Sequence, residues 1–170
     1  LYTVLERKAG QDTARVVGSM TEVLHAPSNP QAVLDRLMDP DIKILSLTVT
    51  EKGYCYNTDG DIDQTNALIQ EDLKSPEAPK TALGYVVSAL ARRRQAGIAP
   101  FTVMSCDNLP GNGHLTERLV IQFADLISAD LSAWIKENVS FPNAMVDRIT
   151  PVTTGTIIDI VTQQFGIEDQ

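Results

Sequence analysis

The sequence has few of the residues that build metal sites, disulfide frameworks and catalytic triads. It contains two cysteines, Cys55 and Cys106, which lie in different segments and lack metal-ligand spacing. Its two histidines, His25 and His114, have no partner at triad or ligand spacing, and no nucleophile-elbow motif is present. The sequence therefore argues against a metal centre and against a nucleophilic triad. So few cysteines fit a reducing compartment, which predicts a cytoplasmic protein.

Long apolar runs and an excess of positive charge are also absent. No segment approaches the roughly 20 apolar residues of a membrane span, and the N-terminal residues show no signal-peptide pattern. The 14 Lys and Arg residues against 22 Asp and Glu residues give a net charge of −8, which on average repels nucleic acids and anionic membranes. We therefore expect a soluble single domain, or part of one, without a nucleic-acid or membrane partner.

What the sequence does contain is an alternation of apolar strands and amphipathic helices, which predicts an α/β layer fold. Residues 42–50 form an almost continuous apolar and β-branched run, as in a parallel strand buried on both faces. A second strand is expected at 101–106, and a peripheral antiparallel hairpin at 2–7 and 15–20. Apolar residues recur at helical spacing in five further segments, which predicts helices over 30–38, 79–96, 115–126, 130–137 and 156–165.

Two charged segments invite functional interpretations that we weigh against simpler ones. The acidic run at 57–63 lacks the glycine and the distal glutamate where a calcium loop requires them, so we interpret it as a solvated turn. Arg92, Arg93 and Arg94 come near the end of a predicted helix, where positive charge is favourable. A solvated face is the simplest interpretation of these arginines, and contact with an anion is the alternative.

Polar residues follow the predicted strands at 48–54 and 105–108 and recur at 143–148. Ligands of open parallel sheets bind beyond the carboxyl ends of the strands, so these segments are expected to converge on one edge. The alternative is that each polar residue caps a helix or a turn. The loop at 107–113 opens a helix whose amides could face an anion, but it lacks a phosphate-loop lysine and a dinucleotide glycine fingerprint.

The stretch at 139–151 combines apolar strand-like residues with polar ones. An unpartnered buried polar group costs about 1 to 3 kcal/mol, so several in one segment indicate an internal network or a site. Pro142 interrupts any regular ladder. The residues expected to be buried are Val139, Phe141, Met145, Val146 and Ile149, and the polar ones are Asn143, Asp147 and Arg148.

Three motifs contain these polar segments. They are Thr-Val-Thr-Glu-Lys-Gly-Tyr at 48–54, Phe-Thr-Val-Met-Ser-Cys-Asp-Asn-Leu-Pro-Gly-Asn-Gly at 101–113, and Phe-Pro-Asn-Ala-Met-Val-Asp-Arg-Ile-Thr-Pro at 141–151. Together they closely resemble the mannitol dehydrogenase and hexuronate (fructuronate, tagaturonate) reductase family of polyol-specific long-chain dehydrogenases. The resemblance covers nearly the whole chain. It implies a Rossmann-like, mostly parallel sheet with flanking helices, and metal-independent hydride transfer between NAD(H) and a sugar alcohol or sugar acid, of the mannitol/fructose or mannonate/fructuronate type.

Two parts of the family pattern are not found in these 170 residues. They are the first, glycine-rich βα unit and the C-terminal helical domain with its catalytic lysine. Residue 1 also lies inside a strand-like run. We therefore expect residues 1–170 to be a partial NAD-binding domain, inactive alone, whose missing C-terminal domain is its partner. The rival hypothesis is a non-catalytic α/β interaction or regulatory module.

The resemblance also assigns roles to individual residues. Asn143 matches the family asparagine that holds the reacting oxygen. A side-chain amide aimed at a carbonyl that becomes an alkoxide stabilises the developing charge, and losing such a donor costs about 2.7 to 4 kcal/mol. Asp147 and Arg148 remain open between an ion-paired clamp of the loop and contact with substrate or cofactor. The positions implied to bind the cofactor are Thr50, Glu51, Cys106, Asp107 and Asn108.

Overall fold

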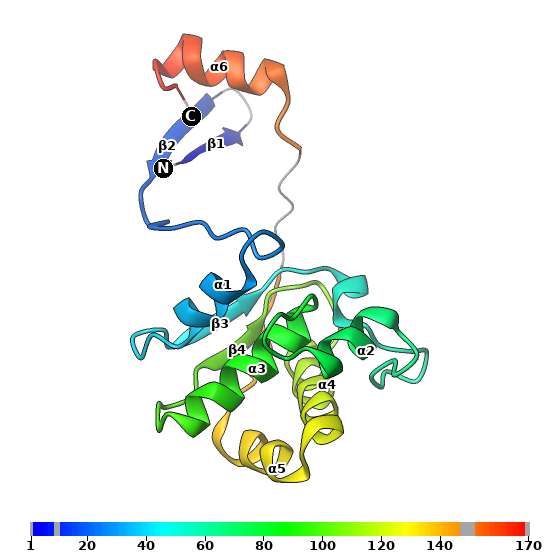
Figure 1. Cartoon of the computed structure of the whole chain (residues 1–170). Coiled ribbons are helices and arrows are strands. Elements are labelled where there is room, and N and C mark those ends of the chain that lie inside the picture. The colour runs from blue at the N-terminus through cyan, green and yellow to red at the C-terminus, as the bar shows by residue number, and fades with distance from the viewer. Residues whose placement is uncertain (1, 9–10, 147–151, 169–170) are drawn as a thin grey trace. The chain divides into compact units, whose positions relative to one another are not determined.

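The computed structural model describes residues 2–8, 11–146 and 152–168 (Figure 1). The chain divides into two compact units, Leu1–Val23 with Arg148–Gln170, and Leu24–Asp147. No helix in the described ranges is long and apolar enough to cross a membrane.

The smaller unit contains the predicted hairpin and a helix. Strands β1 (Tyr2–Lys8) and β2 (Gln11–Val17) pair antiparallel, from Tyr2 opposite Val17 to Lys8 opposite Gln11. The hairpin is thus confirmed. Its second strand starts and ends earlier than expected, because the ladder continues through residues that we had assigned to the turn. Helix α6 (Gly155–Phe165) also confirms a prediction, and its first turn is capped by Thr154.

The larger unit is built on two parallel strands, β3 (Ile44–Leu47) and β4 (Thr102–Ser105), in register from Ile44 opposite Thr102 to Leu47 opposite Ser105. Figure 1 shows helices gathered around this pair. The alternation of strand and helix confirms the α/β prediction. Besides a short 3₁₀ turn η1 (Glu51–Tyr54), the helices are α1 (Pro30–Leu37), α2 (Ala67–Lys74), α3 (Ala82–Gln95), α4 (Asn112–Ile127) and α5 (Ala129–Asn138).

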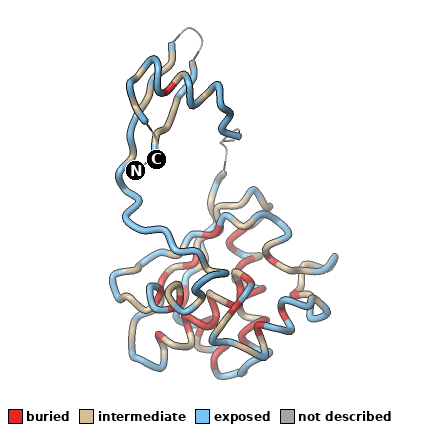
Figure 2. Tube along the Cα trace, turned by 45° about the horizontal axis from the view of Figure 1, so that its top comes forward, coloured by how far each residue is buried: buried red, intermediate tan, exposed pale blue. Residues whose placement is uncertain are grey.

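The hydrophobic core of this unit lies where α3 and α4 pack with β4. Val103 of β4 is fully buried, and α4 packs against β4, α3 and α5. Figure 2 shows the buried residues concentrated inside the larger unit. The core therefore sits beneath the helices and leaves the loops after the strands free to form a site. The helical residues in this core include Leu83, Val86, Val87, Leu90, Leu119, Val120 and Phe123.

Strand β3 differs from its prediction, because it is shorter and only one of its faces is buried. Leu47 is buried and Leu45 is half-buried, whereas Ile44 is 59% exposed and Ser46 is also exposed. The side chains of a strand alternate between its faces, and no described residue covers the face that carries Ile44. The apolar run therefore indicated a strand correctly, but the expectation of two buried faces was wrong.

Helix α3 begins at Ala82 rather than at residue 79. Thr81 caps it by accepting a hydrogen bond from the Gly84 N–H (2.9 Å), and Thr81 is itself held by the buried carboxylate of Asp72. Asp72 lies on α2, a helix that the sequence did not predict. The start of α3 is thus determined by a residue on another helix.

The solvated-face interpretation is wrong for Arg93. This side chain is 1% exposed, and its guanidinium donates to the carbonyls of Leu37 (2.6 Å), Ala99 (2.7 Å), Ile42 and Asp39. It also stacks 4.8 Å from the centre of the Phe101 ring. Arg93 therefore ties the end of α1 and the start of β3 to α3 by donating to backbone carbonyls, of which that of Asp39 also accepts from the Ile42 N–H.

Candidate active site at the ends of the parallel strands

The loop after β4 is bound directly to the loop after β3. The Asp107 carboxylate accepts hydrogen bonds from the backbone N–H of Val49 (3.0 Å, to Oδ2) and of Thr50 (2.9 Å, to Oδ1). These bonds join the polar segments at 48–54 and 105–108, which were expected to converge. Both oxygens of Asp107 are therefore engaged by donors of the chain itself.

Tyr54 completes this connection from within the core. Its side chain is 1% exposed, and its hydroxyl donates to Asp107 Oδ2 (2.7 Å) and lies 2.5 Å from Ser105 Oγ. Burial, together with the neighbouring carboxylate, raises the pKa of Tyr54 to about 12. Burial opposes ionisation of Asp107, but the hydrogen bonds from Tyr54, Val49 and Thr50 outweigh it and lower the pKa of this carboxyl. Asp107 is thus a charged acceptor that fixes both loops.

Thr50 has a backbone conformation that is rare for any residue except glycine. Its φ is 62° and its ψ is 168°, in a region that costs other residues about 1 to 3 kcal/mol. The Asp107 bond to the Thr50 N–H and the bond from the Gly53 N–H to the Thr50 carbonyl (3.0 Å) hold it there. The strain lies at the end of a parallel strand, where binding sites of such folds occur.

The third polar segment meets the loop after β4 at the N-terminus of α4. The residue before α4, Gly111, has no side chain to cap the helix. Asn143 caps it instead, since its Oδ1 accepts from the N–H groups of Gly113 (2.9 Å) and His114 (3.4 Å). Only a carbonyl oxygen can accept from these donors, so the Asn143 Nδ2 group faces away from the helix. These amides are consequently occupied and do not form the open anion site considered for this loop.

Asn112, which sequence reasoning did not single out, links the segments. Its side chain is 2% exposed, and its Nδ2 donates to the carbonyls of Asp107 (3.1 Å) and Ala144 (2.9 Å). Its Oδ1 accepts from the Ala144 N–H (2.9 Å). The only signal in the sequence was an asparagine between two glycines at a helix start, which does not reveal the distant partner.

The segment around Asn143 is not the buried strand that we expected. No strand occurs among its described residues, 139–146, although the Ser140 carbonyl accepts from Val103 N–H of β4 (3.0 Å). Met145 is 93% exposed and Asn143 is also exposed, whereas Val139 is buried. The backbone groups of Ala144 bond to the Asn112 side chain instead of to a neighbouring strand. Phe141 and Val146, also expected to be buried, are half-buried, and Asp147, Arg148 and Ile149 lie outside the described residues.

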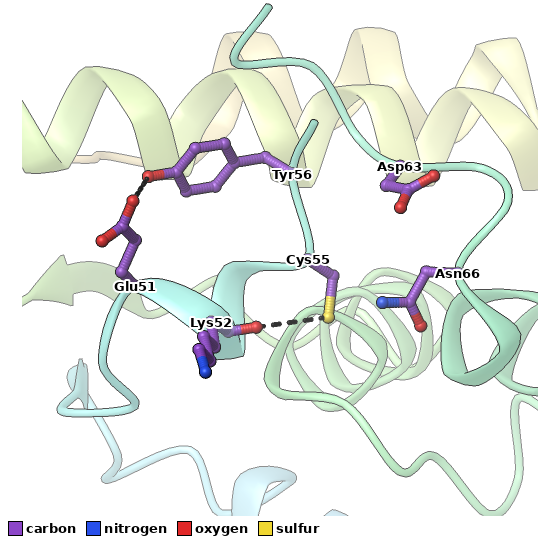
Figure 3. Close-up of a pocket in the computed structure, with 6 residues that line it drawn as sticks. All are labelled: Glu51, Lys52, Cys55, Tyr56, Asp63 and Asn66. Atoms are coloured by element: carbon purple, nitrogen blue, oxygen red, sulfur yellow. Dashed lines mark hydrogen bonds between the residues drawn. The ribbon is translucent and has the colours of Figure 1, made fainter. Parts of the chain in front are cut away.

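A pocket of about 360 Å³ opens beside the start of η1 (Figure 3). Glu51 lies on its exposed side, where its Oε1 accepts from the Tyr56 hydroxyl (2.9 Å). Among the described residues, no group of three or more His, Cys, Asp or Glu side chains could hold a metal ion. The residues that line the pocket are mostly polar and of both charges: Glu51, Lys52, Cys55, Tyr56, Asp63 and Asn66.

The remaining predicted cofactor contacts lie on the same edge. Cys106 is half-buried, and its N–H donates to the Leu47 carbonyl (2.8 Å), which extends the pairing of β3 with β4 by one bond. Asn108 is exposed, and its amide has no hydrogen-bond partner among the described residues. Thr50 and Glu51 are exposed as well. Three of the predicted cofactor residues thus carry exposed polar side chains, whereas the Asp107 carboxylate is bound within the chain.

A parallel β-α arrangement with polar residues gathered at the carboxyl ends of its strands defines the nucleotide-binding class of α/β domains. The profile of the mannitol dehydrogenase Rossmann domain matches residues 1–170, and the chain belongs to this family. The resemblance predicted from the three motifs is confirmed, and so is the Rossmann-type fold with a parallel sheet and an antiparallel hairpin.

Characterised relatives extend the comparison. The chain is 46% identical to the polyol:NADP oxidoreductase of Gluconobacter oxydans (strain 621H) and 45% identical to the D-mannonate oxidoreductase of Escherichia coli (strain K12), covering 99% of this chain and 35% of each relative. It also matches Pseudomonas fluorescens mannitol 2-dehydrogenase in a ternary complex with NAD and D-mannitol, with a TM-score of 0.91 at 45% identity, covering 96% of this chain and 34% of that one. The chain thus spans about a third of the length of these proteins.

Proposed function

We propose that the protein containing this chain is an NAD-dependent oxidoreductase, independent of metal, that transfers hydride between NAD(H) and a sugar alcohol or a sugar acid. Relatives named for mannitol, mannonate and polyols support this substrate class. A relative in complex with NAD supports the cofactor, although another is named for NADP. The chain supplies part of the cofactor domain, and its partner is the C-terminal domain that carries the proton-accepting lysine.

The orientation of Asn143 is the observation that carries this proposal. Its carbonyl oxygen is bound to two N–H groups at the start of α4, which leaves its NH₂ group as an exposed donor. The partial positive charge of a helix N-terminus polarises a bound amide and makes its N–H groups stronger donors. Asn143 is therefore suited to bind a substrate oxygen that gains negative charge during hydride transfer to a ketone.

The exposed side chains of Thr50, Glu51 and Asn108 fit a nicotinamide cofactor, because they flank the carboxyl ends of both parallel strands. When bound, the cofactor supplies or takes up the hydride. Asp107 shapes this side of the site by holding the strained backbone of Thr50, and Cys106 contributes backbone at its floor. For Asp147 and Arg148 the proposal keeps both roles, bracing of the loop and contact with substrate or cofactor.

The test uses the full-length protein and follows NADH oxidation with D-fructose, D-fructuronate and D-tagaturonate, and NAD reduction with D-mannitol. Asn143→Ala should lower kcat about 10²- to 10³-fold while the Kd for NADH stays within about two-fold. Asn138→Ala, an exposed asparagine at the end of α5, is the matched control and should leave both unchanged.

Comparable losses of kcat and NADH affinity in Asn143→Ala would contradict the oxyanion role. Absence of turnover with all four substrates would favour a non-catalytic binding module. The isolated 170-residue chain should show no turnover, since the proposal places the proton-accepting lysine in the C-terminal domain.

A further inference from the structure

We propose that Asn112 is a positioning residue for hydride transfer, which holds Asn143 in the orientation that binds the reacting oxygen. This inference rests on the proposed function, because it assigns to Asn112 no contact with substrate or cofactor. It concerns a residue at the start of α4 that is 2% exposed and connects the loop after β4 with the loop that carries Asn143.

The first support is that the side-chain oxygen and both side-chain N–H groups of Asn112 form hydrogen bonds that join the two loops. Its carbonyl oxygen and NH₂ group pair with the N–H and the carbonyl of Ala144, as a strand neighbour would. The second hydrogen of the NH₂ group binds the Asp107 carbonyl. Three bonds from one buried side chain therefore fix the backbone immediately after Asn143 against the backbone of Asp107.

The second support is the close approach of the two backbones. A Cβ atom at Gly113 would lie 2.5 Å from the carbonyl carbon and oxygen of Pro142 and 2.7 Å from the backbone nitrogen of Asn143. Only glycine allows this contact. The backbone before and at Asn143 thus rests on Gly113, and the backbone after it is bound by Asn112.

The third support is that the backbone of Asn112 is itself bound by a buried side chain. Thr116 is fully buried, and its hydroxyl donates to the Asn112 carbonyl (2.7 Å). Asn143 then accepts from the next two N–H groups of the same turn, those of Gly113 and His114. Consecutive residues 112, 113 and 114 consequently determine both the backbone position and the side-chain orientation of Asn143.

Loss of the Asn112 side chain should let the Asn143 amide drift from its productive position. A misplacement of about 1 Å can cost about 10²-fold in rate. Because Asn112 acts only through Asn143, its removal should matter little once the Asn143 amide is gone. A residue that merely stabilised the fold would not show this dependence.

The experiment is a double-mutant cycle in the full-length protein, with NADH and whichever of D-fructose, D-fructuronate or D-tagaturonate it reduces. Asn112→Ala should lower kcat about 10- to 100-fold with the KM for NADH within about two-fold. The double variant with Asn143→Ala should lie within about two-fold of Asn143→Ala alone, because coupled residues are non-additive. The control is Ser132→Ala, at a buried polar residue of α5. In the double variant its effect on kcat should multiply with that of Asn143→Ala, as expected for two independent residues.

A second readout does not depend on turnover. Hydrogen exchange at the N–H groups of Gly113 and His114, which donate to Asn143, should accelerate at least about tenfold in Asn112→Ala, as expected when a local contact opens. If Asn112→Ala does not fold, the same measurements are made on Asn112→Asp. This variant keeps an acceptor for the Ala144 N–H and loses the bonds donated to the carbonyls of Asp107 and Ala144.

The outcomes separate the two proposals. If the full-length protein turns over none of the four substrates, the proposed function fails. If it turns over but Asn143→Ala leaves kcat unchanged, the oxyanion role of Asn143 fails, and the positioning role of Asn112 fails with it. If Asn143→Ala lowers kcat but the Asn112 variant does not, or if the two losses multiply in the double variant, only the positioning role is overturned. Unchanged exchange at Gly113 and His114 in the Asn112 variant also overturns it.

Discussion

The hydroxyl of Tyr54 donates a 2.7 Å hydrogen bond to the carboxylate of Asp107, although the two residues are separated by 53 positions in the sequence. Tyr54 is buried in the core, and the Asp107 carboxylate that it binds also accepts hydrogen bonds from the backbone N–H groups of Val49 and Thr50. The loop after β3 is therefore held from the loop after β4.

Asp107→Asn should destabilise the protein in a pH-dependent way. The pKa of Asp107 is lowered in the folded state, so its contribution is present above the unfolded value of about 3.9 and is lost as pH falls through the folded value. We expect a loss of about 1 to 3 kcal/mol near pH 7 that shrinks below about pH 4. Urea unfolding across this range measures it. Asp159→Asn, an exposed position on α6, is the control, and a loss independent of pH would contradict the prediction.

Thr50→Gly should stabilise the fold and weaken cofactor binding. Glycine removes the strain of φ 62°, so the free energy of unfolding should rise by about 1 kcal/mol after the entropic cost of glycine. The affinity for NADH should fall if the Thr50 side chain contacts the cofactor, and titration calorimetry of the full-length protein measures this. Thr58→Gly, an exposed loop position without positive φ, should instead lose up to about 1 kcal/mol. Equal stability effects at both positions would argue against strain at Thr50.

Arg93→Lys should be strongly destabilising although it keeps the charge. An ammonium group cannot reach the four carbonyls that the guanidinium satisfies, so some are left buried without donors. We expect a loss of about 2 to 4 kcal/mol in urea unfolding. Arg92→Lys, one position earlier on α3 and only half-buried, should change stability by less than about 0.5 kcal/mol. Similar values for the two variants would show that charge alone matters here.

Gly84→Ala should disrupt the junction of α2 and α3. A Cβ at this position would lie 2.1 Å from Asp72 Oδ2, which is buried and also binds the Thr81 N–H (3.0 Å). The clash should cost about 2 to 4 kcal/mol in thermal or urea unfolding. The matched control is Gly155→Ala on α6, where no described residue outside the adjoining backbone comes within 4 Å of the new Cβ, so little change is expected. A neutral Gly84→Ala would mean that Asp72 can move without cost.

The elements that the sequence predicted correctly depend on local patterns. Apolar spacing of three and four residues indicated α1, α3, α4, α5 and α6, and β-branched runs indicated β3, β4 and the hairpin. The predicted strands also located the polar segments that follow them, at 48–54 and 105–108. These patterns can be recognised in the sequence because they repeat over neighbouring residues.

The errors occurred where a distant partner decides the outcome. The start of α3 depends on Asp72, and the burial of Arg93 depends on carbonyls from α1 and the segments beside β3 and β4. The stretch around Asn143 is apolar enough for a strand, yet its backbone bonds to the Asn112 side chain. Local composition does not reveal these contacts.

By itself, the sequence thus determined the family, the order of helices and strands apart from α2 and the short turn η1, and the candidate residues. Only the tertiary structure decided which of them meet and in which orientation: Asp107 with both oxygens on the loop after β3, and Asn143 with its oxygen on α4 and its NH₂ group turned away from the helix. The physical reason is that helical and strand periodicity reflects neighbouring residues, whereas hydrogen bonds such as these join groups 30 to 58 positions apart.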